Sequence, residues 1–227
     1  MSGRKAVVAC SVMKLELEKV IGDRPIDLHL LEQGLHNTPK LMPARIAEKV
    51  AEVAADKPEE IILGYGLCSN GVLGVGGGDS PLVIPRCHDC ISLLLGSVER
   101  YNEVFRQNPG TYYLSAGWVA EKDDPLGCVE NKYAPRLGLE KAMKGMKMEL
   151  ENYTHICYID NGLGDQAQLK ARAHENCRAF NLEYTEIQGS LEYFEKMIDQ
   201  PAEGPEFIRL EPGQELDEDQ FYEYSDY

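Results

Sequence analysis

Cysteine and histidine side chains cluster at three places in the first 90 residues of the chain. These are Cys10, Cys68 and the segment 87–90, which reads Cys-His-Asp-Cys. Thiolates and imidazoles are the ligands that zinc prefers, and a site of two or three cysteines with one histidine leaves zinc an open position. Three cysteines without the histidine could instead hold an iron–sulfur cluster that leaves one iron free for substrate. We therefore expect a metal site, with zinc as the metal and an iron–sulfur cluster as the alternative.

The segment 87–90 also permits a second kind of chemistry. Cys87 and Cys90 form a C-x-x-C pair, and they share one face if they lie in the first turn of a helix. A helix N-terminus and the neighbouring Arg86 lower a thiol pKa, so we expect at least one thiolate near neutral pH. This pattern is also typical of a thiol–disulfide oxidoreductase. In the metal site, His88 would be a ligand or an acid–base group and Asp89 would orient it, which makes both candidate catalytic residues.

Alternating strands and helices must position these side chains. Short apolar runs predict strands, which we place at residues 5–10, 25–31, 61–66, 81–85, 111–114, 155–159, 182–187 and 206–210. Apolar residues at helical spacing predict helices at residues 13–20, 40–56, 91–106, 137–151, 166–180 and 189–198. The polar, proline-containing stretch 121–136 predicts a long loop. This alternation predicts an α/β fold with a mainly parallel sheet in Rossmann-like layers.

The predicted domain covers residues 1–210, with possible lobes at 1–120 and 137–210. Residues 211–227 carry seven acidic side chains and no Lys or Arg, which predicts a flexible acidic tail. The tail could be a docking segment or only a solvated end.

The predicted strands bring the cysteines together. Cys10 ends the first strand, Cys68 follows the 61–66 strand, and the segment 87–90 follows the 81–85 strand. The carboxyl ends of parallel strands lie at one edge of a sheet, where such folds bind ligands. Polar and aromatic neighbours that could line this site and bind a cofactor or substrate are Tyr65, Asn70 and Arg86, with His36 and Trp118 as weaker candidates.

Other chemically capable residues have a simpler structural interpretation. Cys157 lies in an apolar strand and Cys177 in a helix, so we expect both to be structural, and Cys128 lies in the predicted loop. The glycine-rich stretch 74–78 could cradle a phosphate, but it lacks the Gly-Lys-Ser/Thr of a P-loop and is better explained as a flexible or closely packed loop. The stretch 162–165 matches only half of a dinucleotide-binding fingerprint.

Composition excludes several classes of function. The net charge of −15 disfavours nucleic-acid binding and docking on anionic lipid. No run of apolar residues is long enough to span a membrane or to serve as a secretion signal, so we expect a cytoplasmic protein. The seven cysteines are an odd number in a large chain, which argues against a disulfide framework.

Four segments resemble an uncharacterised domain-of-unknown-function family of anaerobic bacteria and methanogenic archaea. The similar segments lie at residues 62–71, 84–91, 109–113 and 158–165, and the resemblance spans roughly residues 5–210. In that family the positions of Cys10, Cys68 and Cys90 belong to the motif and that of Cys87 varies. The resemblance therefore favours a metal site of Cys10, Cys68 and Cys90, with His88 as the fourth ligand.

Members of that family are often encoded near corrinoid-dependent methyltransferases. The resemblance thus implies a role in one-carbon metabolism, as a metal-dependent enzyme (a transferase) that acts on a small molecule, or as an accessory factor. A corrinoid protein or a methyltransferase would be the partner. A non-catalytic binding partner of a methyltransferase and the thiol–disulfide oxidoreductase remain the alternatives.

Overall fold

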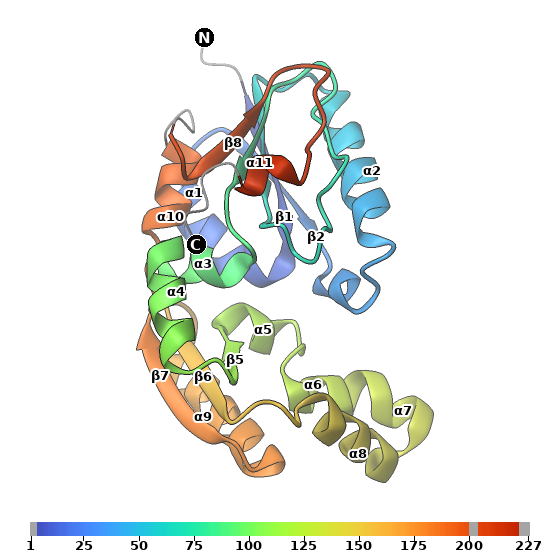
Figure 1. The fold of residues 1–227 in the computed structure, drawn as a ribbon, viewed down its shortest axis with the longest axis vertical. Helices are drawn as coiled ribbons and strands as arrows, with labels where there is room; N and C mark the ends of the chain where they lie inside the picture. Colours follow the sequence, from blue (N-terminus) through green and yellow to red (C-terminus); the bar gives the residue numbers. More distant parts are fainter. Residues whose placement is uncertain (1–3, 200–203, 223–227) are drawn as a thin grey trace.

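The computed structural model describes residues 4–199 and 204–222, and its fold is α/β with two separate sheets (Figure 1). The first sheet has five strands in the order β2-β1-β3-β4-β8. Its strands are β1 (Lys5–Cys10), β2 (Ile26–Leu31), β3 (Glu60–Gly64), β4 (Leu82–Pro85) and β8 (Phe207–Leu210). The first four are parallel and β8 pairs antiparallel with β4, so the predicted mainly parallel α/β fold is confirmed.

The second sheet has three parallel strands in the order β5-β6-β7. They are β5 (Thr111–Leu114), β6 (His155–Asp160) and β7 (Glu183–Gln188). The sheets divide the chain differently from the expected lobes, because β5 lies in the second sheet whereas the chain returns to the first sheet for β8. The first lobe therefore contains both ends of the described chain (Figure 1).

Helices cover both sheets (Figure 1). Those attached to the first sheet are α1 (Lys14–Ile21), α2 (Met42–Ala54), α3 (Cys90–Leu95), α4 (Val98–Gln107), α10 (Glu192–Asp199) and α11 (Asp219–Tyr222), with the 3-10 helices η1 (Ser11–Met13) and η2 (Gln33–Asn37). Those of the second lobe are α5 (Ala116–Ala120), α6 (Pro125–Cys128), α7 (Ala134–Leu137), α8 (Leu139–Glu149) and α9 (Gln166–Phe180), with the π-helical turn η3 (Val129–Tyr133). None of the helices in these described segments has both the length and the apolar character needed to cross a bilayer.

The central strands of the first sheet are apolar on both faces because helices cover both sides. Every residue of β3 and β4 is buried, as are all residues of β1 after Lys5. Continuous apolar strands of this kind are typical of parallel sheets. The chain leaves β1 toward β2 in one direction and later adds β3 on the other side of β1. The crevice outside the carboxyl ends of β1 and β3 is therefore a topological switch point, where open α/β sheets bind ligands.

Two predicted elements differ from the structure. The single helix expected at residues 91–106 is two helices, α3 and α4, because Gly96 adopts a left-handed conformation (φ 94°) and ends the first. Ser97 then begins α4 by accepting a hydrogen bond from the backbone of Arg100 at 3.2 Å. Gly96 is thus a helix stop signal and Ser97 a helix start signal, and the two interrupt what looks in the sequence like one continuous apolar stripe.

The prediction of a long loop at residues 121–136 is wrong, because this stretch forms α6, η3 and α7. Pro125 and Pro135 lie in the first turns of α6 and α7, where a missing N–H costs nothing. Asp124 caps α6 by accepting a hydrogen bond from Gly127 at 3.1 Å. The prolines therefore begin helices here instead of breaking them.

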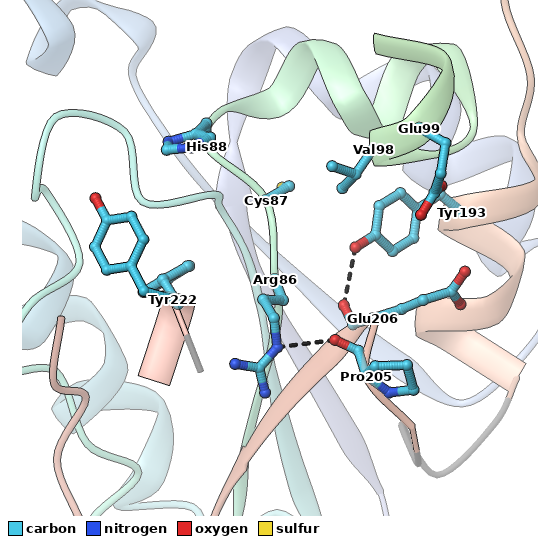
Figure 2. Close-up of a pocket in the computed structure, with 10 residues that line it drawn as sticks. Arg86, Cys87, His88, Val98, Glu99, Tyr193, Pro205, Glu206 and Tyr222 are labelled. Atoms are coloured by element: carbon cyan, nitrogen blue, oxygen red, sulfur yellow. Dashed lines mark hydrogen bonds between the residues drawn. The ribbon is translucent and has the colours of Figure 1, made fainter. Parts of the chain in front are cut away.

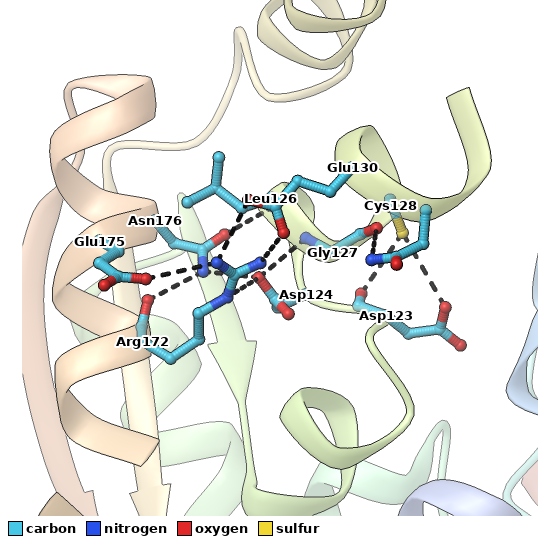
Figure 3. Close-up of polar contacts among 10 residues, drawn as sticks. Asp123, Asp124, Leu126, Gly127, Cys128, Glu130, Arg172, Glu175 and Asn176 are labelled. Carbon is cyan, nitrogen blue, oxygen red and sulfur yellow. Dashed lines mark hydrogen bonds and ion pairs between the residues drawn. The ribbon is translucent and has the colours of Figure 1, made fainter. Parts of the chain in front are cut away.

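A buried polar network anchors these helices to α9 (Figure 3). The carboxylate of Asp124, which is 1% exposed, accepts hydrogen bonds from Arg172 Nε at 3.0 Å and Asn176 Nδ2 at 2.7 Å. Arg172 also pairs with Glu130 at 2.8 Å. Because each buried charge has a partner, the attraction within the network offsets the cost of taking these charges out of water, and the network links the helical part of the second lobe to α9.

Much of the segment expected to be a flexible tail is folded. The backbone of Leu216 exchanges hydrogen bonds of 2.9 Å with Gly74 and Val75 in the glycine-rich stretch, and Leu216 and Phe221 are buried. A side chain at Gly76 would meet the carbonyl oxygen of Gln214 at 2.4 Å. Of the two alternatives for the stretch 74–78, a flexible or a closely packed loop, the structure therefore shows the second, and the glycines admit the chain that follows β8.

A buried carboxyl group lies where the two lobes meet. Glu16 of α1 is fully buried, and its Oε1 accepts a 3.3 Å hydrogen bond from Asn161, which follows β6. Its Oε2 has no hydrogen-bond partner among the described residues. Burial raises the pKa of Glu16 above its usual range.

We predict that Glu16→Gln reduces the loss of stability that occurs as the pH rises above the ordinary pKa range of a glutamate carboxyl. A carboxyl group whose pKa is raised in the folded state stabilises the fold below its unfolded pKa, and this contribution is lost as the pH rises through the folded pKa. Across that window, the free energy of unfolding of the variant should therefore rise relative to that of the wild type by up to about 1.4 kcal/mol per pH unit. Unfolding by urea at a series of pH values measures this difference, and parallel curves for the two proteins would contradict it.

Candidate functional site

Cys10 lies at the switch point, at the end of the central strand β1. It is 1% exposed and is the N-cap of the 3-10 helix η1, where the nearby backbone of Val12 lowers the pKa of its thiol, although burial raises this pKa by more. Glu121 and Asp123 of the second lobe lie close enough to influence its pKa electrostatically. Cys10 therefore belongs to the region where the two lobes meet.

Cys68 follows β3 in a strained turn. Cys68, Ser69 and Asn70 all have left-handed backbone conformations, with φ of 46°, 57° and 65°. Three consecutive residues other than glycine in this region are energetically unfavourable, and strain of this kind is concentrated at functional sites. The turn aims the Cys68 sulfur at the backbone N–H groups of Gly66 and Cys90, both of which donate hydrogen bonds to it.

The loops after β3 and β4 are held against each other by their backbones. Leu67 donates to the carbonyl of Cys87 at 2.9 Å and Cys68 donates to that of His88 at 2.8 Å. This approach requires glycine at position 66, where a Cβ would meet the Cys87 oxygen at 2.7 Å. The pairing brings Cys68 to the N-terminus of α3, whose first residue is Cys90.

Cys10, Cys68, Cys90 and Tyr65 lie close enough to one another to interact electrostatically. The pKa of Cys68 is raised by Cys10, that of Cys90 by Cys10 and Cys68, and that of the Tyr65 hydroxyl by all three cysteines. Tyr65 is 1% exposed, and its hydroxyl has no hydrogen-bond partner among the described residues. A buried hydroxyl without a partner costs about 1–3 kcal/mol. We define Cys10, Cys68, Cys90 and Tyr65 as the thiol cluster.

The structure corrects the prediction that at least one of these cysteines is a thiolate near neutral pH. Burial raises the pKa of the Cys10 thiol to about 12 and raises the pKa values of Cys68, Cys87 and Cys90 well above the usual range. The helix N-terminus and the backbone amides act in the opposite direction, but desolvation is the larger effect. Without a bound cation these thiols are therefore protonated at neutral pH.

Three side chains with the spacing of a metal's ligands do not occur among the Cys, His, Asp and Glu residues at positions 4–199 and 204–222.

His88 and Asp89, the predicted catalytic residues, do not belong to the thiol cluster. The imidazole of His88 is exposed and lies beside the ring of Tyr222, with the ring centroids 6.3 Å apart (Figure 2). Asp89 caps α3, and its Oδ1 accepts a 2.9 Å hydrogen bond from Ile91 instead of one from His88. His36 also lies near Asp89. Its charge lowers the pKa of the Asp89 carboxyl, but burial raises this pKa by more. The roles predicted for His88 and Asp89 stay predictions.

The other candidate residues take different positions. Arg86 follows β4, and its guanidinium donates to the backbone carbonyls of Pro205 at 2.8 Å and Phe207 at 3.3 Å. Asn70 is exposed on the strained turn. Trp118 is half-buried and packs against the cores of both lobes.

The three remaining cysteines lie in the second lobe, apart from the thiol cluster. Cys157 and Cys177 are buried on β6 and α9, and Cys128 donates a weak hydrogen bond to the Asp123 carbonyl at 3.6 Å. All seven cysteines are free, so the prediction that no disulfide framework exists is confirmed.

A pocket of about 270 Å³ opens beside the thiol cluster (Figure 2). Its lining comes from five separate parts of the chain and consists of Arg86, Cys87, His88, Val98, Glu99, Tyr193, Pro205, Glu206, Phe221 and Tyr222. Cys87 lines the pocket and lies three residues before Cys90 of the cluster. The sequence analysis did not predict the lining residues of α4, α10 and the segment after β8. These residues are up to about 130 positions apart in the sequence and share no motif.

Comparison with known proteins gives one match. Residues 30–198 match the model of the family described as protein of unknown function (DUF1638). No curated protein and no solved structure matches the chain.

Proposed function

This chain belongs to the DUF1638 family, and we propose that it is a metalloprotein whose thiol cluster binds a zinc ion through Cys10, Cys68 and Cys90. The observation that carries the proposal is the convergence of three thiols from three separate parts of the chain at the switch point of the first sheet. Three thiolates are a donor set that suits zinc, and they leave its fourth position open.

The surroundings of the sulfurs support this proposal. The backbone of Val12 lowers the pKa of Cys10, and hydrogen bonds from the backbones of Gly66 and Cys90 lower that of Cys68, so these groups would stabilise thiolates once a cation offsets the cost of burial. Hydrogen bonds of this kind orient ligands and adjust the charge at a metal site. The cluster is also shielded from water, because its three cysteines are at most 7% exposed.

The partnerless hydroxyl of Tyr65 supports a reactive centre over a purely structural one. A structural zinc site needs only its ligands, whereas a buried hydrogen-bonding group beside an open position can bind what occupies that position. When bound by thiolates, zinc acts as a Lewis acid that activates a substrate thiol or polarises a carbonyl. The role proposed for Tyr65 is to donate a hydrogen bond to that substrate.

The thiol–disulfide alternative has less support. Catalytic thiols of that class are exposed and have lowered pKa values. Cys87 and Cys90 are 4% and 7% exposed, and burial raises the pKa of each. An iron–sulfur cluster on the same three cysteines is distinguished from zinc by its visible absorption in anaerobically purified protein. The expected link to one-carbon metabolism and a methyltransferase or corrinoid partner stays a prediction.

Proton release on metal uptake tests the proposal. Each thiol must lose its proton to become a ligand, and an ordinary or raised thiol pKa leaves it protonated at neutral pH. Adding zinc to the metal-free chain at pH 7 should therefore release about three protons per zinc bound. Calorimetry in buffers of different ionisation enthalpy counts these protons. Release of fewer than about one, or no saturable binding, would contradict the proposal.

A further inference from the structure

A second pocket, separate from the one beside Cys87, opens where the helical part of the second lobe faces the first lobe. Its volume is about 190 Å³. Gln33 of η2 contributes one side chain from the first lobe, and the other lining residues belong to the second lobe. We call this space the tyrosine pocket, and it is lined by Gln33, Tyr112, Asp123, Cys128, Tyr133, Met146, Glu149, Leu150 and Tyr153.

The tyrosine pocket carries one uncompensated negative charge. Asp123, which is 5% exposed, is paired with the ammonium group of Lys132. Glu149, the last residue of α8, is exposed, and no side chain at positions 4–199 or 204–222 forms an ion pair or a hydrogen bond with its carboxylate. No Lys, Arg or His occurs among the described residues that line the pocket. The pocket therefore favours a ligand with a single positive charge.

Aromatic rings and apolar side chains form most of the wall. The rings of Tyr112 and Tyr153 are in edge-to-face contact, with their centroids 5.4 Å apart. Met146 of α8 and Leu150, which follows this helix, are 4% and 5% exposed. An ammonium group is strongly hydrated and loses much of its hydration against such a wall, whereas a guanidinium is weakly hydrated and stacks on aromatic rings. The wall thus favours a guanidinium over an ammonium group.

Gln33 adds a neutral hydrogen-bond acceptor from the first lobe. Its Oε1 is buried and has no hydrogen-bond partner among the described residues. A buried acceptor without a partner costs about 1–3 kcal/mol, so a ligand that donates to it recovers this cost. An alkylguanidinium has five N–H donors and no acceptor, which matches a pocket that offers a carboxylate and an amide oxygen.

We propose that the tyrosine pocket binds a guanidinium group, stacked on a tyrosine ring and with N–H groups toward Glu149. The volume of about 190 Å³ is below the usual range for ligand pockets of about 300–1,000 Å³, so the group is carried on a short alkyl chain. A free alkylguanidine and an arginine side chain of a partner protein both present this chemistry. The proposal stands on this pocket alone and does not require the zinc centre.

Calorimetric titration of the chelator-treated full chain tests the site without any metal. The probes are n-propylguanidinium, its neutral isostere n-propylurea, and n-butylammonium, which carries the same charge on a chain of similar length. We expect n-propylguanidinium to bind saturably with a Kd of about 1 mM or below, and the other two to bind about tenfold more weakly or not at all. Absence of saturable binding by n-propylguanidinium, or equal binding by either of the other probes, would overturn the proposal.

A further probe, N-acetylarginine amide, decides where the guanidinium group comes from. This compound models an arginine within a polypeptide chain. Affinity equal to that of n-propylguanidinium would assign the pocket to an arginine of a partner protein, because the flanking amides would then lie outside the pocket without hindrance. A loss of about tenfold or more would assign it to a free alkylguanidine.

A pair of variants on α8 assigns the position of the cation. Glu149→Gln should weaken the binding of n-propylguanidinium about threefold to tenfold, because it removes a charged acceptor at a partly solvated position. Glu140→Gln makes the same change at an exposed position of this helix outside the pocket and should leave the affinity unchanged. Equal affinities for the wild type and Glu149→Gln would refute the proposed position. Since no metal is present, a failure of zinc binding would leave these results intact.

Discussion

The variant Cys90→Ser is expected to lose zinc binding. Serine is nearly isosteric with cysteine, but its hydroxyl does not ionise near neutral pH and is a poor zinc ligand. Cys90 is the first residue of α3, and its backbone N–H donates to the Cys68 sulfur, so two of the three ligands meet at this point. Loss of a residue that supports a ligand weakens metal binding about 10- to 100-fold. Loss of a ligand itself should weaken zinc binding by more than this. Competition with a chromogenic chelator measures the affinity.

The matched control for this prediction is Cys177→Ser. Cys177 is buried to the same extent as Cys90, at 6% and 7% exposed, but it lies on α9 in the second lobe. Its replacement should reduce stability slightly and leave the zinc affinity unchanged. Equal loss of zinc from both variants would mean that the ion binds elsewhere or that both changes act through misfolding.

The variant Gly117→Ala should destabilise the protein more than any other glycine-to-alanine change outside the strained turns. Gly117 lies in α5 at the junction of the lobes, and a Cβ there would lie 1.6 Å from the carbonyl oxygen of Val12. Both groups belong to backbone in helical turns, so neither can move alone. We expect a loss of about 3 kcal/mol in the free energy of unfolding. Because Val12 supports the Cys10 sulfur, zinc affinity should fall as well.

The control for the glycine prediction is Gly145→Ala, which should have the opposite sign. Gly145 lies within α8, and nothing approaches the position of a Cβ there within 4 Å. Alanine should therefore stabilise the helix by about 0.5–1 kcal/mol. Urea denaturation of both variants compares them. A stable Gly117→Ala protein would show that α5 and η1 are not in close contact.

The parts of this site that the sequence predicts are those that depend on local pattern. Apolar runs ending in polar residues identified β1, β3 and β4, and parallel strands must end at one edge. The convergence of Cys10, Cys68 and Cys90 followed from those two facts. The strand β8 was predicted from its apolar residues, but its antiparallel direction depends on the path of the chain through the second lobe.

Other features depend on contacts between distant segments. The left-handed turn at Cys68 has no glycine at its first three positions, so no residue type announces it. The pocket needs Phe221 and Tyr222, and their packing depends on Leu216 pairing with the glycine-rich stretch. The thiol pKa values were predicted in the wrong direction because burial of the helix N-terminus outweighs its favourable charge.

The central claim, that zinc binds to the three cysteines, is tested most directly by X-ray absorption at the zinc edge. The measurement uses the full chain loaded with one equivalent of zinc, beside the Cys90→Ser variant. The account predicts three sulfur neighbours at about 2.3 Å in the wild type and a shell with fewer sulfurs in the variant. A zinc shell made only of nitrogen and oxygen in the wild type would contradict it.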